Sequence, residues 1–162
     1  METIKGDLIE LSKSGYFSVI LHSCNTRNRF GAGIAKQIKQ AFPQAYIADC
    51  QAAQIGLNQL GLISQAVISL PLSKVNKTAG KVLTVVNMYT QDSYSTSKNK
   101  VYVDYPAFAK CLSLVKLQHS TARIGIPSGI SSGLANGDKQ QIHDIIDQEL
   151  NGLDYVLVDF VL

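Results

Sequence analysis

The segment from residue 16 to residue 22 is almost wholly apolar. A run of this kind is typical of a strand that is buried on both faces of its sheet. Such a sheet needs a layer on each side, and in α/β proteins helices provide those layers. This one segment therefore predicts a sheet that is covered by helices.

Strands and helices are predicted to alternate along the rest of the chain. Further strands are expected at residues 3–11, interrupted at Gly6-Asp7, at 66–70 and 82–89 as a hairpin, and at 122–127 and 155–161. Helices are expected at 34–42, 43–54, 104–118 and 138–150, with Asp104 and Asp138 as N-caps. This order favours the α/β class, with a mixed, largely parallel sheet and helices on both faces.

Length and composition bound the organisation of the chain. It has 162 residues, of which 46% are hydrophobic, so it can bury a sizeable core without disulfides or metal. No repeat or linker divides it, and residues 1–162 are expected to form a single domain. The cysteines are odd in number and far apart, and the histidines lack metal-ligand spacing: Cys24, Cys50, Cys111, His22, His119 and His143. We therefore expect no metal and no disulfide.

Charge and hydropathy exclude other function classes. The net charge of +3 is small and scattered, which favours small anions over nucleic acid as partners. The apolar runs fall short of the roughly 20 residues that a membrane-spanning helix needs, and no signal peptide is recognisable. A cytoplasmic protein with no membrane partner is the expectation.

Two glycine-rich loops are predicted to follow strands, at the sheet edge where α/β proteins bind ligands. The first, residues 23–33, contains Arg27 and Arg29 and ends in Gly31-Ala32-Gly33 at a predicted helix start. The second, residues 127–137, combines glycines with serine hydroxyls and also leads into a helix. Helix N-termini and close glycine backbones favour phosphate groups, so the pair predicts a ligand with a diphosphate. A tight turn and a plain surface loop are the alternative interpretations.

Single side chains near these loops allow more than one interpretation. His22 closes the apolar strand, where it is either a hydrogen-bonded core residue or a group that reaches a bound substrate. Asp7 either forms a turn or accepts a hydrogen bond from an exocyclic amine of a base. Cys24 is expected to be a packed thiol, and no role is assigned to His119 or His143.

Three blocks of the sequence carry a family resemblance: Gly6-Asp7-Leu8-Ile9, then Leu21-His22-Ser23-Cys24-Asn25 with Gly31-Ala32-Gly33-Ile34-Ala35, and Ile126-Pro127 with Ser132-Gly133-Leu134. The chain resembles macrodomains, and among them the small ADP-ribose 1″-phosphate phosphatases. The resemblance implies a three-layer α/β/α sandwich. It also implies ADP-ribose or ADP-ribose 1″-phosphate as the ligand, with ADP-ribosylated macromolecules as a further class of partner, and no cofactor.

The resemblance implies a role for each matching residue. Asp7 would contact the adenine amine, with the backbone of Leu8 and Ile9 beside the base and Phe160 flanking the ring. Asn25 would hold the distal ribose. His22 would be the acid or base that acts at the 1″-phosphate, and Asn25 would bind the developing charge. Two loops would enclose the distal ribose and the diphosphate: Gly31, Ala32, Gly33 and Ile34 in the first, and Ser131, Ser132, Gly133 and Leu134 in the second.

Departures from a related branch narrow the expected activity. Glutamyl-ADP-ribose hydrolases use a lysine after the fourth strand and an aspartate past the second glycine-rich loop. Here the corresponding positions lie in residues 87–91, which contain no lysine, and at Ala135. The sequence therefore favours hydrolysis of ADP-ribose 1″-phosphate. A non-catalytic ADP-ribose reader, a hydrolase that removes ADP-ribose from proteins or nucleic acid, and a nucleotide-binding domain of another family remain alternatives. The polar segment 90–100 is expected to be a loop, either a flap over the cleft or a disordered stretch.

Overall fold

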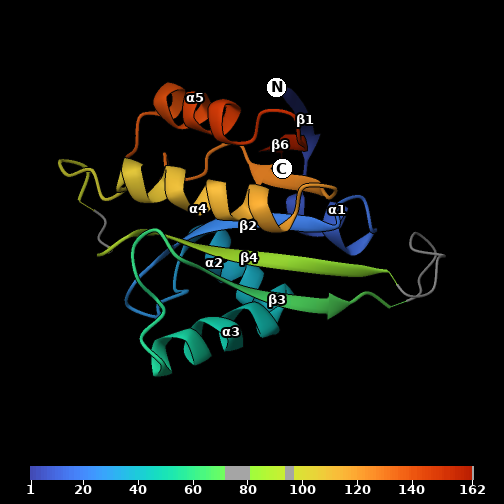
Figure 1. The fold of residues 1–162 in the computed structure, drawn as a ribbon, viewed down its shortest axis with the longest axis horizontal. Coiled ribbons are helices and arrows are strands. Elements are labelled where there is room, and N and C mark those ends of the chain that lie inside the picture. The colour runs from blue at the N-terminus through green and yellow to red at the C-terminus, as the bar shows by residue number, and fades with distance from the viewer. Residues whose placement is uncertain (72–80, 94–96, 162) are drawn as a thin grey trace.

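The computed structural model describes residues 1–71, 81–93 and 97–161 (Figure 1). Within them, six strands form one sheet in the order β1-β6-β5-β2-β4-β3. All neighbouring pairs are parallel except the antiparallel pair of β3 and β4. The strands are β1 (Glu2–Gly6), β2 (Val19–Asn25), β3 (Ile63–Ser69), β4 (Val82–Gln91), β5 (Arg123–Pro127) and β6 (Asp154–Phe160).

Helices cover both faces of the sheet, as the buried strand predicts. They are α1 (Leu8–Lys13), α2 (Gly33–Ala41), α3 (Pro43–Gln54), α4 (Tyr105–Gln118) and α5 (Lys139–Glu149). Figure 1 shows α4 and α5 on one side of the sheet and α2 and α3 on the other. Along β2, Leu21 packs into the core beneath α4 and α5, while Ile20 packs into the core beneath α1 and α2. The predicted α/β class, with a mixed and largely parallel sheet in three layers, is confirmed.

The first predicted strand was wrong beyond Gly6. The chain leaves β1 there, and Asp7 caps a short helix by accepting hydrogen bonds from the backbone N–H groups of Ile9 (2.8 Å) and Glu10 (3.1 Å). Leu8, Ile9 and Ser12 are the buried face of that helix, α1. A capping aspartate before residues with helical spacing outweighs the strand propensity of the isoleucine and leucine side chains.

The second predicted strand was placed three residues too early, because β2 begins at Val19 and continues to Asn25. At its end the pairing with β4 shifts: Cys24 is opposite Tyr89, whereas Asn25 is opposite Gln91. A bulge of this kind re-aims the side chain that follows it. The bulge therefore changes the direction of the Asn25 side chain at the edge of the sheet where the first loop begins.

Most of the other predicted elements are confirmed with small shifts in their ends. β3 and β4 form the expected antiparallel pair, and Asp104 and Asp138 cap α4 and α5. The expected loop at 90–100 starts later, since Thr90 and Gln91 belong to β4, and its residues 94–96 lie outside the described part of the chain. The turn expected at residues 74–80 also lies outside it.

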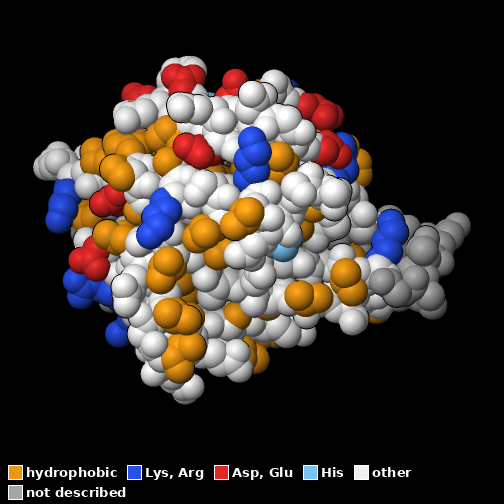
Figure 2. Space-filling view, in the orientation of Figure 1, with side chains coloured by type: hydrophobic (Ala, Val, Ile, Leu, Met, Phe, Trp, Pro, Cys, Tyr) orange, Lys and Arg blue, Asp and Glu red, His pale blue; other side chains and the backbone are white. Residues whose placement is uncertain are grey.

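Charged side chains are unevenly spread over the face drawn in Figure 2, where acidic groups gather over α5 and basic groups are scattered.

Among the residues that the structure describes, no group of three or more His, Cys, Asp or Glu side chains is arranged to hold a metal ion. No helix in residues 1–71, 81–93 and 97–161 has the length and hydropathy to cross a membrane.

Candidate functional site

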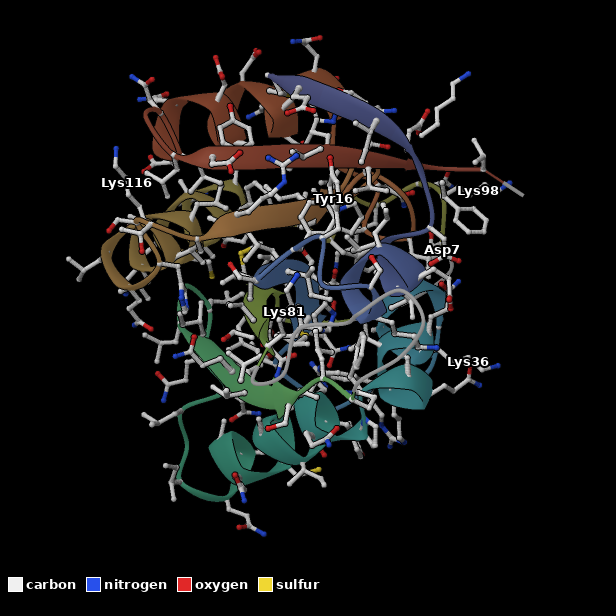
Figure 3. The ribbon with its side chains drawn as sticks, turned by 90° about the vertical axis from the view of Figure 1, so that its right-hand side faces the viewer. Asp7, Tyr16, Lys36, Lys81, Lys98 and Lys116 are labelled. Atoms are coloured by element: carbon white, nitrogen blue, oxygen red, sulfur yellow. The ribbon has the colours of Figure 1, made fainter. Side chains whose placement is uncertain are left out.

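A cavity of about 850 Å³ opens at the carboxyl ends of the parallel strands. Its volume lies in the range that small-molecule sites occupy. In Figure 3 β1 and β6 run toward the side of the molecule where Asp7 is labelled. Most of the cavity wall comes from four segments: the β1–α1 junction, the end of β2 with the first loop, the second loop, and the end of β6. Segments far apart in sequence thus form one site.

The first loop is folded around the side chain of Asn25. Its Oδ1 accepts hydrogen bonds from the N–H of Arg27 (2.9 Å) and of Arg29 (3.4 Å), and its Nδ2 donates to the carbonyl oxygen of Arg29 (3.0 Å). The loop ends at Gly33, which has a φ of +58° and starts α2. No side chain caps α2, so the N–H groups of its first turn are available to an anion in the cavity.

The second loop is held in an unusual backbone conformation at Ser131, whose φ is +56°. Its hydroxyl lies 2.6 Å from that of Ser23, and its carbonyl oxygen accepts a hydrogen bond from the N–H of Gly137 (2.9 Å). Gly129 and Gly133 have no atoms within 4 Å of an added Cβ, so their backbones are open to a ligand. The two loops therefore meet at Ser23 and Ser131.

One end of the cavity carries carboxylates and an aromatic ring. Gly6, next to Asp7, is opposite Phe160 in the β1–β6 pairing, and the ring of Phe160 is 56% exposed. Asp159 accepts a hydrogen bond from the Ser128 hydroxyl (2.8 Å). Arg29 and Lys139 also line the cavity. The wall therefore combines hydrogen-bond acceptors and a ring at the β1–β6 end with two cationic side chains that attract anions.

Comparisons with known proteins show which fold this arrangement belongs to. No family model matches the chain. An ADP-ribose 1″-phosphate phosphatase from Meyerozyma guilliermondii is 33% identical over 101 residues, which cover 59% of this chain and only 56% of that relative. The macrodomain of Thermus aquaticus DarG superposes with a TM-score of 0.66 at 22% identity, covering 99% of this chain and 97% of that one. Thermosipho africanus DarTG in complex with ADP-ribose gives a TM-score of 0.73 at 15% identity, covering 100% of this chain and 42% of that one. The chain therefore has the fold of macrodomains.

Most residues that the sequence assigned to the site do line the cavity: Asp7, Leu8, Asn25, Gly31, Ala32, Gly33, Ile34, Ser131, Gly133, Leu134 and Phe160. Ile9 does not, because its side chain packs into the core beneath α1. Ser132 does not either, because its hydroxyl donates to the carbonyl oxygen of Gly129 within the loop (3.1 Å).

His22 is the main departure from the expected site. Its side chain is fully buried outside the cavity wall, and its Nε2 lies 2.6 Å from the Oδ1 of Asn87. Burial lowers the pKa of His22 to about 4, although the hydrogen bond with Asn87 acts in the opposite direction. A neutral imidazole that does not touch the cavity fits the core alternative, and this position does not support direct catalysis by His22.

Cys24 lines the cavity but is only 4% exposed, and its Sγ lies 3.6 Å from the Nε2 of His22. Burial raises the pKa of Cys24 well above its ordinary value, and the nearby Asp49 and Cys111 add to the effect. A protonated thiol is a poor nucleophile. The geometry thus agrees with the expectation of a packed thiol.

Several polar residues of the cavity wall were missed by sequence reasoning. They are Ser23, Gln37, Gln91, Ser128, Lys139 and Asp159. Ser23 and Ser128 lie in the two loops that the sequence singled out, so their positions gave a usable signal. Asp159 and Lys139 gave none, because their place in the wall depends on how β6 and α5 pack beside the second loop.

Proposed function

We propose that this chain is a macrodomain that acts as a single domain over residues 1–162, binds ADP-ribose and hydrolyses ADP-ribose 1″-phosphate to ADP-ribose and phosphate. The observation that carries the proposal is the pair of glycine-rich loops that meet at Ser23 and Ser131 beside the cavity. Two anion-binding loops in one cavity suit a diphosphate with a sugar on each side. The partial likeness to a phosphatase supports the choice of substrate.

The wall suggests one orientation for the ligand. Adenine would lie at the β1–β6 end, where Asp7 supplies an acceptor for the exocyclic amine and Phe160 supplies an exposed ring. The diphosphate would lie between the first and second loops. The distal ribose would then lie beside Asn25, with its 1″-phosphate near Arg29.

Hydrolysis in this proposal depends on stabilisation of charge. Water attacks the phosphorus, the bond to the ribose oxygen breaks, and the products are ADP-ribose and inorganic phosphate. The Arg29 guanidinium and the uncapped N–H groups of α2 would stabilise the negative charge of the phosphoryl group in the transition state. His22 takes no direct part, because it lies outside the wall.

The test measures phosphate release from ADP-ribose 1″-phosphate, with chromatographic identification of the product, beside calorimetry of ADP-ribose binding. Arg29→Gln should lower kcat/KM by about a hundredfold while ADP-ribose affinity changes by less than about threefold. Arg27→Gln is the matched control, because its Nε donates to the carbonyl oxygen of Asp92 (2.9 Å) and its side chain is not part of the wall. Equal loss in both variants would reject the role of Arg29.

A non-catalytic reader of ADP-ribose is the second candidate. It is favoured by the burial and neutral state of His22, which leave the wall without the acid or base that the resemblance implied. Tight binding of ADP-ribose without phosphate release would establish the reader. Release of free ADP-ribose from a modified protein or nucleic acid would instead establish a hydrolase of attached ADP-ribose. Absence of binding would reject both candidates.

A further inference from the structure

A chain of hydrogen bonds runs through the core behind the cavity wall. His22 lies 2.6 Å from the Oδ1 of Asn87, and the Nδ2 of Asn87 donates to the Ser64 hydroxyl (3.0 Å). Ser64 lies 2.7 Å from the hydroxyl of Tyr89, which donates to the Oδ1 of Asp49 (2.6 Å). The chain crosses β2, β4 and β3 and ends on the helix α3.

Each bond in this chain has one consistent direction. The only proton on the Tyr89 hydroxyl goes to Asp49, so Ser64 must donate to Tyr89. Ser64 in turn accepts from Asn87, whose Oδ1 accepts from the neutral His22. All donors therefore point toward the Asp49 carboxylate, which fixes its Oδ1.

The second carboxylate oxygen of Asp49 reaches the first loop. Its Oδ2 accepts a hydrogen bond from the Nδ2 of Asn28 (2.7 Å). Asp49 is fully buried, and within the described residues it makes no salt bridge. An acceptor that is buried in this way needs both of its donors, since losing one costs about 1–3 kcal/mol. The loop donor is therefore tied firmly to α3.

Asn28 is also the residue at which the first loop turns. Its φ is +55°, a left-handed conformation that asparagine adopts more readily than most residues. On either side of it, Asn25 binds the backbone of Arg27 and Arg29, and the buried Phe30 packs edge-on against His22 with centroids 5.2 Å apart. The position of Asn28 thus sets the path of the backbone toward the cavity wall.

We propose that Asp49, through Asn28, is a positioning residue that holds the first loop in its ligand-binding shape. Asp49 does not line the cavity, so it acts only through the loop. The effect on ligand affinity rests on the proposed function, whereas the effect on loop order does not.

The test exchanges the two partners. Asn28→Asp places a second carboxylate against Asp49. The double variant Asn28→Asp/Asp49→Asn restores one acid, one amide and the hydrogen bond between them, with the amide at position 49 now the donor. We expect the single variant to weaken ADP-ribose binding by at least about tenfold. The double variant should bring the affinity back to within about threefold of the wild type. Hydrogen–deuterium exchange without ligand should quicken across residues 26–33 in the single variant and return to normal in the double.

Ser64→Ala is the matched control, because it breaks the chain on the side of the core and leaves the bond between Asp49 and Asn28. It should lower the unfolding temperature without changing ADP-ribose affinity or exchange in residues 26–33. The proposal would be overturned by a double variant that restores neither ADP-ribose affinity nor the hydrogen–deuterium exchange of residues 26–33. It would also be overturned by an Asn28→Asp variant in which these residues exchange as slowly as in the wild type. If the wild type fails to bind ADP-ribose, the proposed function is wrong. Hydrogen–deuterium exchange in residues 26–33 then decides the role of Asp49 without ligand.

Discussion

The hydroxyls of Ser23 and Ser131, 108 residues apart in sequence, lie 2.6 Å from each other at the wall of the cavity. Ser23 belongs to β2 and Ser131 to the second loop, where its φ of +56° is strained for a residue with a side chain. The bond thus fixes the loop against the rigid centre of the sheet. It links the second loop to the strand from which the first loop continues.

Ser23→Ala should loosen the second loop and weaken ADP-ribose binding by about fivefold, with a loss of about 1 kcal/mol in the free energy of unfolding. Calorimetry and urea denaturation measure the two effects. Ser132→Ala is the control, since its hydroxyl bonds only within its own loop and lies outside the wall. If Ser132→Ala impairs binding as much as Ser23→Ala does, the link between β2 and the loop is not what matters.

Stability should fall in mild acid because of His22. Its pKa is lowered from 6.5 to about 4 in the folded protein, so the unfolded chain binds a proton first as the pH falls. The free energy of unfolding that is present above pH 6.5 should therefore decrease as the pH drops toward 4, by about 3 kcal/mol in total. Urea denaturation between pH 4 and pH 8 measures this slope. In His22→Gln the slope should be much flatter, and an unchanged slope would assign the titration to another group.

Gly33→Glu should abolish ADP-ribose binding. The position has a φ of +58°, lines the cavity, and an added Cβ would lie 3.6 Å from Leu134 on the opposite loop. A side chain there closes the gap between the loops, and its charge repels a diphosphate. Gly56→Glu is the control for backbone strain, because Gly56 has a φ of +71° with open space around it. Calorimetry should find binding in that control and none in Gly33→Glu.

Asp7 should have two separable roles. Asparagine is as good an N-cap as aspartate, so Asp7→Asn should keep α1 and the unfolding temperature. Its amide replaces one acceptor with a donor, so we expect ADP-ribose to bind about tenfold more weakly than to the wild type. Asp138→Asn, at the N-cap of α5 and outside the wall, should change neither property. Unchanged affinity in Asp7→Asn would place the adenine elsewhere.

Sequence reasoning found the layers and the two loops because both depend on local patterns. The apolar run in β2 and the glycines at the strand ends carry their meaning within a few residues. The segment after Asp7 shows the limit of this approach, because its short apolar stretch is compatible with either a strand or a helix. The hydrogen bonds by which Asp7 caps α1 select the helix. The pattern near Gly6 and Asp7 could not distinguish the two.

The direction in which His22 points could not be predicted for a different reason. Neighbouring residues on a strand point to opposite faces, so Ser23 faces the second loop while His22 faces the other side of the sheet. Its partner Asn87 is opposite it in the pairing of β2 with β4. That register depends on the strand order, which a local motif does not contain. The same dependence hid Asp49, whose importance appears only when α3 packs beneath the first loop.

The parallel pairing of β1 with β6 affects how this protein is best handled. Because the two strands run the same way, Glu2 lies at the end of the sheet remote from the cavity, while Phe160 lies at the cavity wall. A label attached near Phe160 would therefore lie at that wall, whereas a label attached near Glu2 would not. Affinity handles and surface tethers therefore belong near Glu2, and fluorescent reporters of ligand binding belong near Phe160.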